Sequence, residues 1–264
     1  MNLASIIAPR FHRRILLPLA LLALASISSA ADAPAKSGSQ DKASPATTTV
    51  KPAAGLTNFL IFRNNRSWNR KPDFEDSLTE LGYKFDVKTS AEISSTDLSK
   101  YRTIIIPGSQ RKDDFYGQYM ENTEAFDRYV TGGGTLLLEL NGAENSNLPL
   151  PRGVRMARHG AKENSIILTN HPLVDPLGGQ PIHASYASHG YLEGTPSDAL
   201  VLATEMEAGK PLMNKPTYVE YTHGKGRVIA ACQCFHDQDG SGRGILMETA
   251  IVYTADRQWY APKK

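Results

Sequence analysis

The strongest constraint on the fold is an alternation of short apolar runs with amphipathic segments in the first half of the chain. The strand-like runs occupy 57–63, 85–87, 103–106 and 135–140. Between them, 73–81 and 122–130 place their apolar residues on one side at helical spacing. Strands that alternate with helices form βαβ units, in which helices cover both faces of a parallel sheet. We therefore predict an α/β fold with an open, mostly parallel sheet.

The second half of the chain is richer in strand-like segments than in helices. Short strands are expected at 166–168, 200–203 and 218–221, and a hairpin turn at 222–226 leads into a further apolar run at 227–235. The last periodic segment, 244–254, has helical length. We expect a flavodoxin-like sheet with helices on both faces and a β-rich C-terminal extension or insertion between Asn145 and His223.

The first 30 residues have the pattern of a secretory signal peptide. Basic residues from Arg10 to Arg14 precede an apolar run at 15–27, and small residues follow up to Ala30. The run is short for a membrane span and contains Pro18. We predict cleavage near Ala30, a periplasmic or secreted protein, and no stable membrane span in the mature form. Retention of the segment as an anchor is the alternative.

Residues 31–55 are rich in Ala, Pro, Ser and Thr and contain no aromatic residue. Such a segment buries too little apolar surface to offset its ordering entropy, so we predict a disordered linker. The remaining 56–262 has the length of one large domain. The net charge is +2, and no basic patch with interleaved aromatic residues occurs. Nucleic acid is therefore excluded as a partner, whereas the linker is compatible with an envelope protein partner.

Two cysteines, Cys232 and Cys234, stand two residues apart in an apparent strand. Side chains at this spacing point to the same face and run parallel, which disfavours a disulfide between them. A metal site needs further ligands at suitable spacing. We predict buried free thiols, no metal and no cofactor.

One loop leaves a calcium alternative open. Asp237, Asp239, Ser241 and Glu248 have the oxygen spacing of a calcium-binding loop, with glycine at the sixth position. However, a strand leads into this loop, and Gly244 stands where a branched apolar residue is usual. Aspartates also favour the N-terminus of a following helix, so capping explains the same residues.

In an open α/β sheet, functional groups gather where the parallel strands end. Four such ends carry polar residues, namely Arg63-Asn64-Asn65, Gly108-Ser109-Gln110, Asn141-Gly142 and His236-Asp237. If the strands are parallel neighbours, these four loops line one edge of the sheet.

The same segments resemble class I glutamine amidotransferases and their non-amidotransferase relatives. The resemblance is carried by IIIPGS at 104–109, YVTGGGTLLLE at 129–139 and CFHDQ at 234–238, followed by a last helix. The stretch from HPL at 171–173 to that helix is similar to the trehalose-utilisation (ThuA-like) branch and to related domains of bacterial glycosidases. The resemblance covers about 57–255.

The resemblance implies that two of the family's three catalytic residues, the cysteine and the glutamate, are missing. The family's cysteine falls on Leu140, its histidine on His236 and its glutamate on Gln238. The loop that stabilises the oxyanion in the family corresponds to Pro107-Gly108-Ser109. Because glutamine hydrolysis needs a thiolate activated by an imidazole, we expect glutaminase activity to be absent.

Polar residues at the strand ends remain candidates for ligand binding. They are Arg63, Asn64, Ser109, Glu139, Asn141, His189 and His236, and they suit a sugar or another small polar ligand. Simpler explanations exist, since asparagine favours tight turns and lone histidines such as His171 and His189 are more often surface residues.

Two functions remain open at this stage. The first is an exported amidotransferase-like domain without glutaminase chemistry that acts as a ligand-binding or accessory module. The alternative is a carbohydrate-metabolism enzyme resembling the ThuA-like branch, in which His236 or His189 acts as acid or base beside Glu139.

Overall fold

The computed structural model describes residues 57–66, 74–110, 114–143, 147–235 and 245–261. The predicted signal peptide and linker lie outside these ranges. So do His236, Gln238 and most of the loop considered for calcium. Within the described residues, no helix combines the length and apolar character needed to cross a bilayer.

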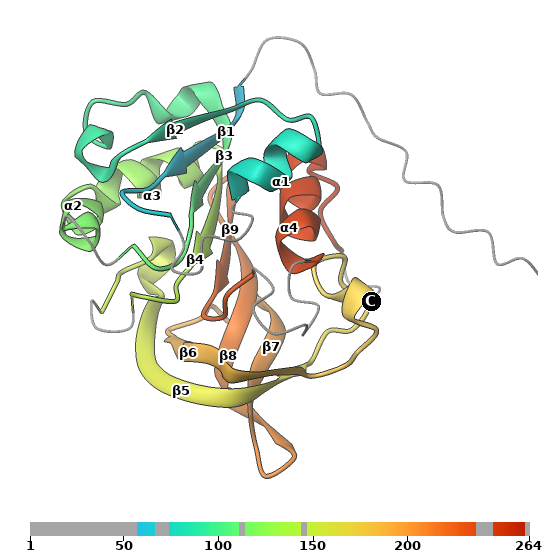
Figure 1. Cartoon of the computed structure of the whole chain (residues 1–264). Coiled ribbons are helices and arrows are strands. Elements are labelled where there is room, and N and C mark those ends of the chain that lie inside the picture. The colour runs from blue at the N-terminus through green and yellow to red at the C-terminus, as the bar shows by residue number, and fades with distance from the viewer. Residues whose placement is uncertain (1–56, 67–73, 111–113, 144–146, 236–244, 262–264) are drawn as a thin grey trace, which may run out of the picture. The chain divides into compact units, whose positions relative to one another are not determined.

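The first half of the sheet is parallel, as predicted. Its strands occur in the spatial order β2 (Phe85–Lys88), β1 (Thr57–Phe62), β3 (Tyr101–Ile106), β4 (Thr135–Glu139) and β9 (Gly226–Ala231). When these five parallel strands are numbered by their order in the sequence, β9 becomes the fifth, and their order across the sheet is 2-1-3-4-5. This is the strand order of flavodoxin-like folds. The expected flavodoxin-like sheet is therefore confirmed (Figure 1).

The sheet continues beyond β9 with antiparallel strands. They follow in the order β8 (Lys210–His223), β7 (Leu200–Glu207), β5 (Arg155–Ile166) and β6 (Ile182–Glu193). This confirms the β-rich extension, which in sequence separates β4 from β9. The strands β7 and β8 are longer than the sequence pattern indicates, and β6 is not among the predicted elements. The strand predicted at 166–168 overlaps β5 only at Ile166, where β5 ends.

Helices cover both faces of the parallel half. Buried residues of α1 (Phe74–Glu80) and α4 (Ile245–Asp256) belong to one core cluster, and those of α2 (Phe115–Glu121) and α3 (Thr123–Thr131) belong to the other (Figure 1). Short 3-10 helices lie at Ser90–Glu92, Leu98–Lys100, Pro151–Gly153 and Asp175–Leu177.

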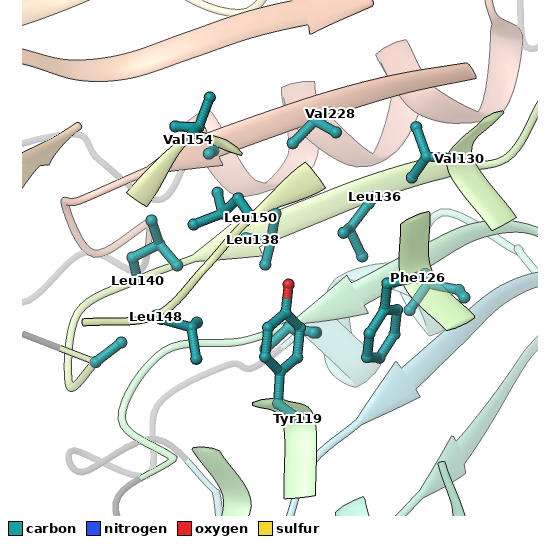
Figure 2. Packing of buried hydrophobic residues seen from close by; sticks show 14 of the residues in the cluster. Tyr119, Phe126, Val130, Leu136, Leu138, Leu140, Leu148, Leu150, Val154 and Val228 are labelled. Carbon is teal, nitrogen blue, oxygen red and sulfur yellow. The ribbon is translucent and has the colours of Figure 1, made fainter. Parts of the chain in front are cut away.

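The two clusters divide the four inner parallel strands, β1, β3, β4 and β9, between their faces. In β1, Leu60 and Phe62 belong to the α3-side cluster, whereas Phe59 and Ile61 belong to the α4-side cluster. This two-sided burial explains why the parallel strands are apolar runs and not alternating patterns. Figure 2 shows the α3-side cluster, in which Leu136 and Leu138 of β4 lie among the side chains of neighbouring elements.

Candidate functional site at the carboxyl edge of the parallel sheet

The carboxyl ends of β1, β3, β4 and β9 are neighbours, because these strands are parallel and adjacent. The segments that follow them are 63–65, 107–110, 140–142 and 232–235, and together they form what we call the carboxyl edge. Of the four strand ends identified in the sequence, the described residues thus bring three together. The fourth, His236-Asp237, lies outside them.

Glu139, the last residue of β4, ties three of these segments together. One carboxylate oxygen accepts a hydrogen bond from the Gly108 amide at 2.9 Å, and the other accepts one from the Phe235 amide at 2.9 Å. The side chain is almost completely buried, at 3% exposure. A carboxylate that accepts two main-chain bonds in a buried place holds the ends of β3 and β9 to β4.

Asn141 and Ser109 form a close contact between the β4 and β3 loops. The Ser109 amide donates to the Asn141 carbonyl at 2.5 Å, and the Asn141 side-chain nitrogen donates to the Ser109 hydroxyl at 3.1 Å. Ser109 has a φ of 65°, an uncommon backbone conformation for serine. A Cβ at Gly108 would overlap the Asn141 side chain, which explains the glycine there.

Gln110 connects the β3 loop to the β1 loop, although the sequence patterns did not single out its side chain. Its oxygen accepts bonds from the amides of Asn64 and Asn65, at 2.8 and 3.2 Å. Its nitrogen donates to the carbonyls of Asn65 and Gly108, at 2.9 and 3.1 Å. Gln110 is wholly buried, so this network is structural.

Two candidate ligand-binding residues of the β1 loop are engaged by other parts of the protein. The Asn64 side chain donates to the Ser90 hydroxyl at 2.7 Å and accepts from the Ser90 amide at 2.8 Å. The Arg63 side chain forms an ion pair with Glu75 of α1, and both side chains are mostly buried. These contacts account for both residues as supports of the β1 loop.

His189 lies in β6, a strand that the sequence pattern did not predict, and it is partly exposed. Its amide donates to the carbonyl of Cys232 at 3.0 Å, which brings β6 to the carboxyl end of β9. The strand β9 itself ends at Ala231, before both cysteines, and therefore is shorter than the predicted 227–235 run. Neither Cys232 nor Cys234 forms a disulfide, and both are buried, as predicted.

Burial raises the pKa of the Cys232 thiol, and the negative charge of Glu205 raises it further. At about pH 8 the native protein should therefore hold this thiol protonated and react slowly with iodoacetamide, because the thiolate is the nucleophile. Mass spectrometry should find Cys232 unmodified under native conditions and alkylated after unfolding in urea. Alkylation of the folded protein at the rate of the unfolded chain would contradict the buried position.

Gln233 is a second residue that the sequence patterns missed. Its side chain is wholly buried, and neither of its amide atoms has a hydrogen-bond partner in the described part of the chain. Ala231 of β9 and Glu139 of β4 are paired across the sheet. Gln233 and Asn141 each stand two residues beyond these paired positions, so both follow the ends of adjacent strands. The side-chain oxygen of Asn141 is also buried without a hydrogen-bond partner among these residues. Adjacent strand ends thus carry buried polar atoms that have no hydrogen-bond partner among the described residues.

His171 is fully buried, contrary to the expectation of a surface residue. Its Nε2 lies 2.9 Å from a carboxylate oxygen of Glu220 in β8, and its Nδ1 accepts a bond from the Leu173 amide at 3.2 Å. Glu220 also contacts Arg227 and accepts a bond from the Tyr253 hydroxyl at 2.8 Å. Because both His171 and Glu220 have 0% side-chain exposure, this pair has no access to a substrate.

Comparison with known proteins gives distant similarities. No family model matches the chain. An uncharacterized protein of Clostridium acetobutylicum is 26% identical over 205 residues, which cover 75% of this chain. The chain spans only 20% of the length of that relative.

Similar solved structures include a glutamine amidotransferase from Thermotoga maritima, with 11% identity and a TM-score of 0.48 over 77% of this chain and 92% of that one. A β-galactosidase from Rahnella sp. R3 has 15% identity and a TM-score of 0.48 over 78% of this chain and 32% of that one. A cytoplasmic protein from Salmonella typhimurium has 15% identity and a TM-score of 0.47 over 75% and 98%. Likenesses this distant say nothing about activity.

Proposed function

We propose that this protein is an exported amidotransferase-like domain that lacks glutaminase chemistry and binds a small polar or sugar ligand at the carboxyl edge, as a binding or accessory module. The observation that carries the proposal is the position of Leu140. This residue stands where the resemblance requires a nucleophile, and its side chain is 1% exposed within the α3-side core cluster (Figure 2). An aliphatic side chain packed in the core cannot attack a substrate.

The main-chain donors of the β3 loop support the same conclusion. The resemblance assigns oxyanion stabilisation to the Pro107-Gly108-Ser109 loop, and that role requires N–H groups aimed at the substrate oxygen. The Gly108 amide donates to Glu139 instead, and the Ser109 amide donates to the Asn141 carbonyl. Both donors are therefore engaged within the protein.

The accessible polar side chains support ligand binding. Asn64 and Ser109 of the carboxyl edge and His189 beside it are partly exposed, whereas Asn141 and Gln233 are buried. Amide, hydroxyl and imidazole groups can both donate and accept hydrogen bonds, which suits the hydroxyl groups of a sugar.

A glutaminase assay and a thermal-shift screen test the two parts of this proposal. The mature protein should release no ammonia from glutamine above a His236→Ala control. A sugar that binds only the folded state should raise the melting temperature. The shift should be reduced in Ser109→Ala, which removes a partly exposed hydroxyl of the carboxyl edge, and persist in Gln180→Leu, a control at an exposed glutamine. Glutamine turnover above the control, or a ligand shift that Ser109→Ala leaves unchanged, would contradict the proposal.

The carbohydrate-metabolism enzyme remains a second candidate because β6 brings His189 to the end of β9, next to the strand that ends in Glu139. In this alternative, His189 acts as acid or base on a sugar substrate. Turnover of a glycoside or sugar that disappears in His189→Gln, with an unchanged melting temperature, would favour this enzyme over the binding module.

Export and anchoring are tested separately. If residues 1–30 are a cleaved signal peptide, the mature protein from the native host begins near Ala31 and is recovered from the periplasm or the medium. An envelope protein partner bound through the linker would co-purify in stoichiometric amount and be lost when 31–55 are deleted.

A further inference from the structure

A hollow lies at the amino edge of the parallel sheet, opposite the carboxyl edge. It has a volume of about 490 Å³ and is lined by Tyr101 and Arg102 of β3, Arg128 and Tyr129 of α3, the glycines at 132–134, and Arg257. We call it the arginine hollow. Sites for small organic ligands have volumes of roughly 300–1,000 Å³, so the hollow is large enough for a metabolite.

The charge of the arginine hollow is positive and largely uncompensated. Arg128 forms an ion pair with Glu124 at 3.5 Å, and both side chains are well exposed. Arg102 and Arg257 form no ion pair with any carboxylate among the described residues. Burial and the charge of Arg102 lower the pKa of Arg257. The two guanidinium groups therefore repel each other without a counter-charge from the described part of the chain.

Main-chain contacts hold these two arginines in place. Arg102 donates to the Ala255 carbonyl in the last turn of α4 at 2.7 Å, and Arg257 donates to the Arg102 carbonyl at 3.1 Å. A cation at the end of a helix is favourable, which accounts for Arg102 as a cap of α4. Capping of α4 does not explain why Arg257 lies beside Arg102, because the Arg257 side chain donates to the Arg102 carbonyl and not to the end of the helix. Each guanidinium also has several further N–H donors, which these bonds leave available.

We propose that the arginine hollow binds a small phosphorylated molecule, with its phosphate held by Arg102 and Arg257. A phosphate monoester carries a charge of about −1.5 to −2 at neutral pH, which matches two uncompensated cations. Arginine is suited to this group because its planar fork donates two parallel bonds to phosphate oxygens. The rings of Tyr101 and Tyr129 line the same hollow and give the remainder of the ligand an apolar surface to pack against.

Isothermal titration calorimetry of the mature protein with glucose 6-phosphate, inorganic phosphate and glucose tests this assignment. Calorimetry is preferred to melting temperatures because phosphate stabilises most proteins by exclusion from their surface. Saturable binding is expected for glucose 6-phosphate and, more weakly, for inorganic phosphate, whereas glucose should not bind in this hollow. Arg257→Gln should weaken the binding of glucose 6-phosphate by about tenfold or more, because it removes a charged donor.

Two further variants keep the test decisive. Arg128→Gln changes an exposed arginine of the same hollow and should weaken the binding without affecting the fold. Arg155→Gln, which alters an exposed arginine paired with Glu193 on β5, should leave the binding unchanged. Absence of saturable phosphate binding, or equal affinity in Arg257→Gln and the wild type, would overturn the proposal. Binding that Arg155→Gln weakens as much as Arg257→Gln would show a nonspecific charge effect and would overturn it as well.

Discussion

Replacing Glu220 with alanine is expected to lower the free energy of unfolding by about 3–5 kcal/mol, because it breaks a buried ion pair. The carboxylate is wholly buried and contacts Arg227, His171 and the hydroxyl of Tyr253. Without it, Arg227 loses its counter-charge, the Tyr253 hydroxyl loses its acceptor, and the buried His171 ring loses a charged neighbour. Urea denaturation followed by circular dichroism measures the change.

Two controls separate this effect from the loss of any carboxylate. Glu163 lies 2.8 Å from His183 on the surface, and Glu163→Ala should cost less than about 1 kcal/mol because exposed pairs contribute little. The double variant Glu220→Leu/Arg227→Met should recover part of the lost stability, since apolar packing can replace a buried pair. Equal stability of Glu220→Ala and the wild type would refute the central role of this cluster.

Replacing Glu139 with alanine should have an effect of similar size, about 3–5 kcal/mol, since hydrogen bonds to charged groups contribute roughly 1.5–3 kcal/mol each. The change leaves the amides of Gly108 and Phe235 without their acceptor. The same urea titration applies. Glu139→Gln should be less damaging, because the remaining amide oxygen accepts one of the two bonds.

A matched control for this second prediction is Glu80→Ala, which removes an exposed carboxylate at the end of α1. It should change the stability by no more than about 0.5 kcal/mol. If Glu139→Ala and Glu80→Ala have the same free energy of unfolding, Glu139 does not hold the carboxyl edge together.

The parallel half of the fold was predictable from the sequence because its inner strands, β1, β3, β4 and β9, are buried on both faces. Such strands are continuous apolar runs. Both ends of β3 and of β4 lie within two residues of the predicted bounds. The antiparallel half was harder. The 12-residue strand β6 and the charged strand β5 have no continuous apolar run, and their pairing with each other decides their structure. Local periodicity does not contain that information.

The candidate site was predictable only in part. The topology rule placed Ser109, Glu139 and Asn141 at one edge, and the structure shows these residues in contact through their loops. The buried amides of Gln110 and Gln233 were missed, since the bonds of Gln110 are made with residues far away in the sequence. The early end of β9 was missed for the same kind of reason, because the carbonyl of Cys232 is used by β6.

The strand order also has a consequence for synthesis on the ribosome. Thr135 of β4 pairs with Arg227 of β9, and the whole antiparallel half is translated between these two partners. Until β9 emerges, β4 has an unpaired edge that invites association with other chains. We therefore expect nascent chains that stop before β9 to depend on chaperones.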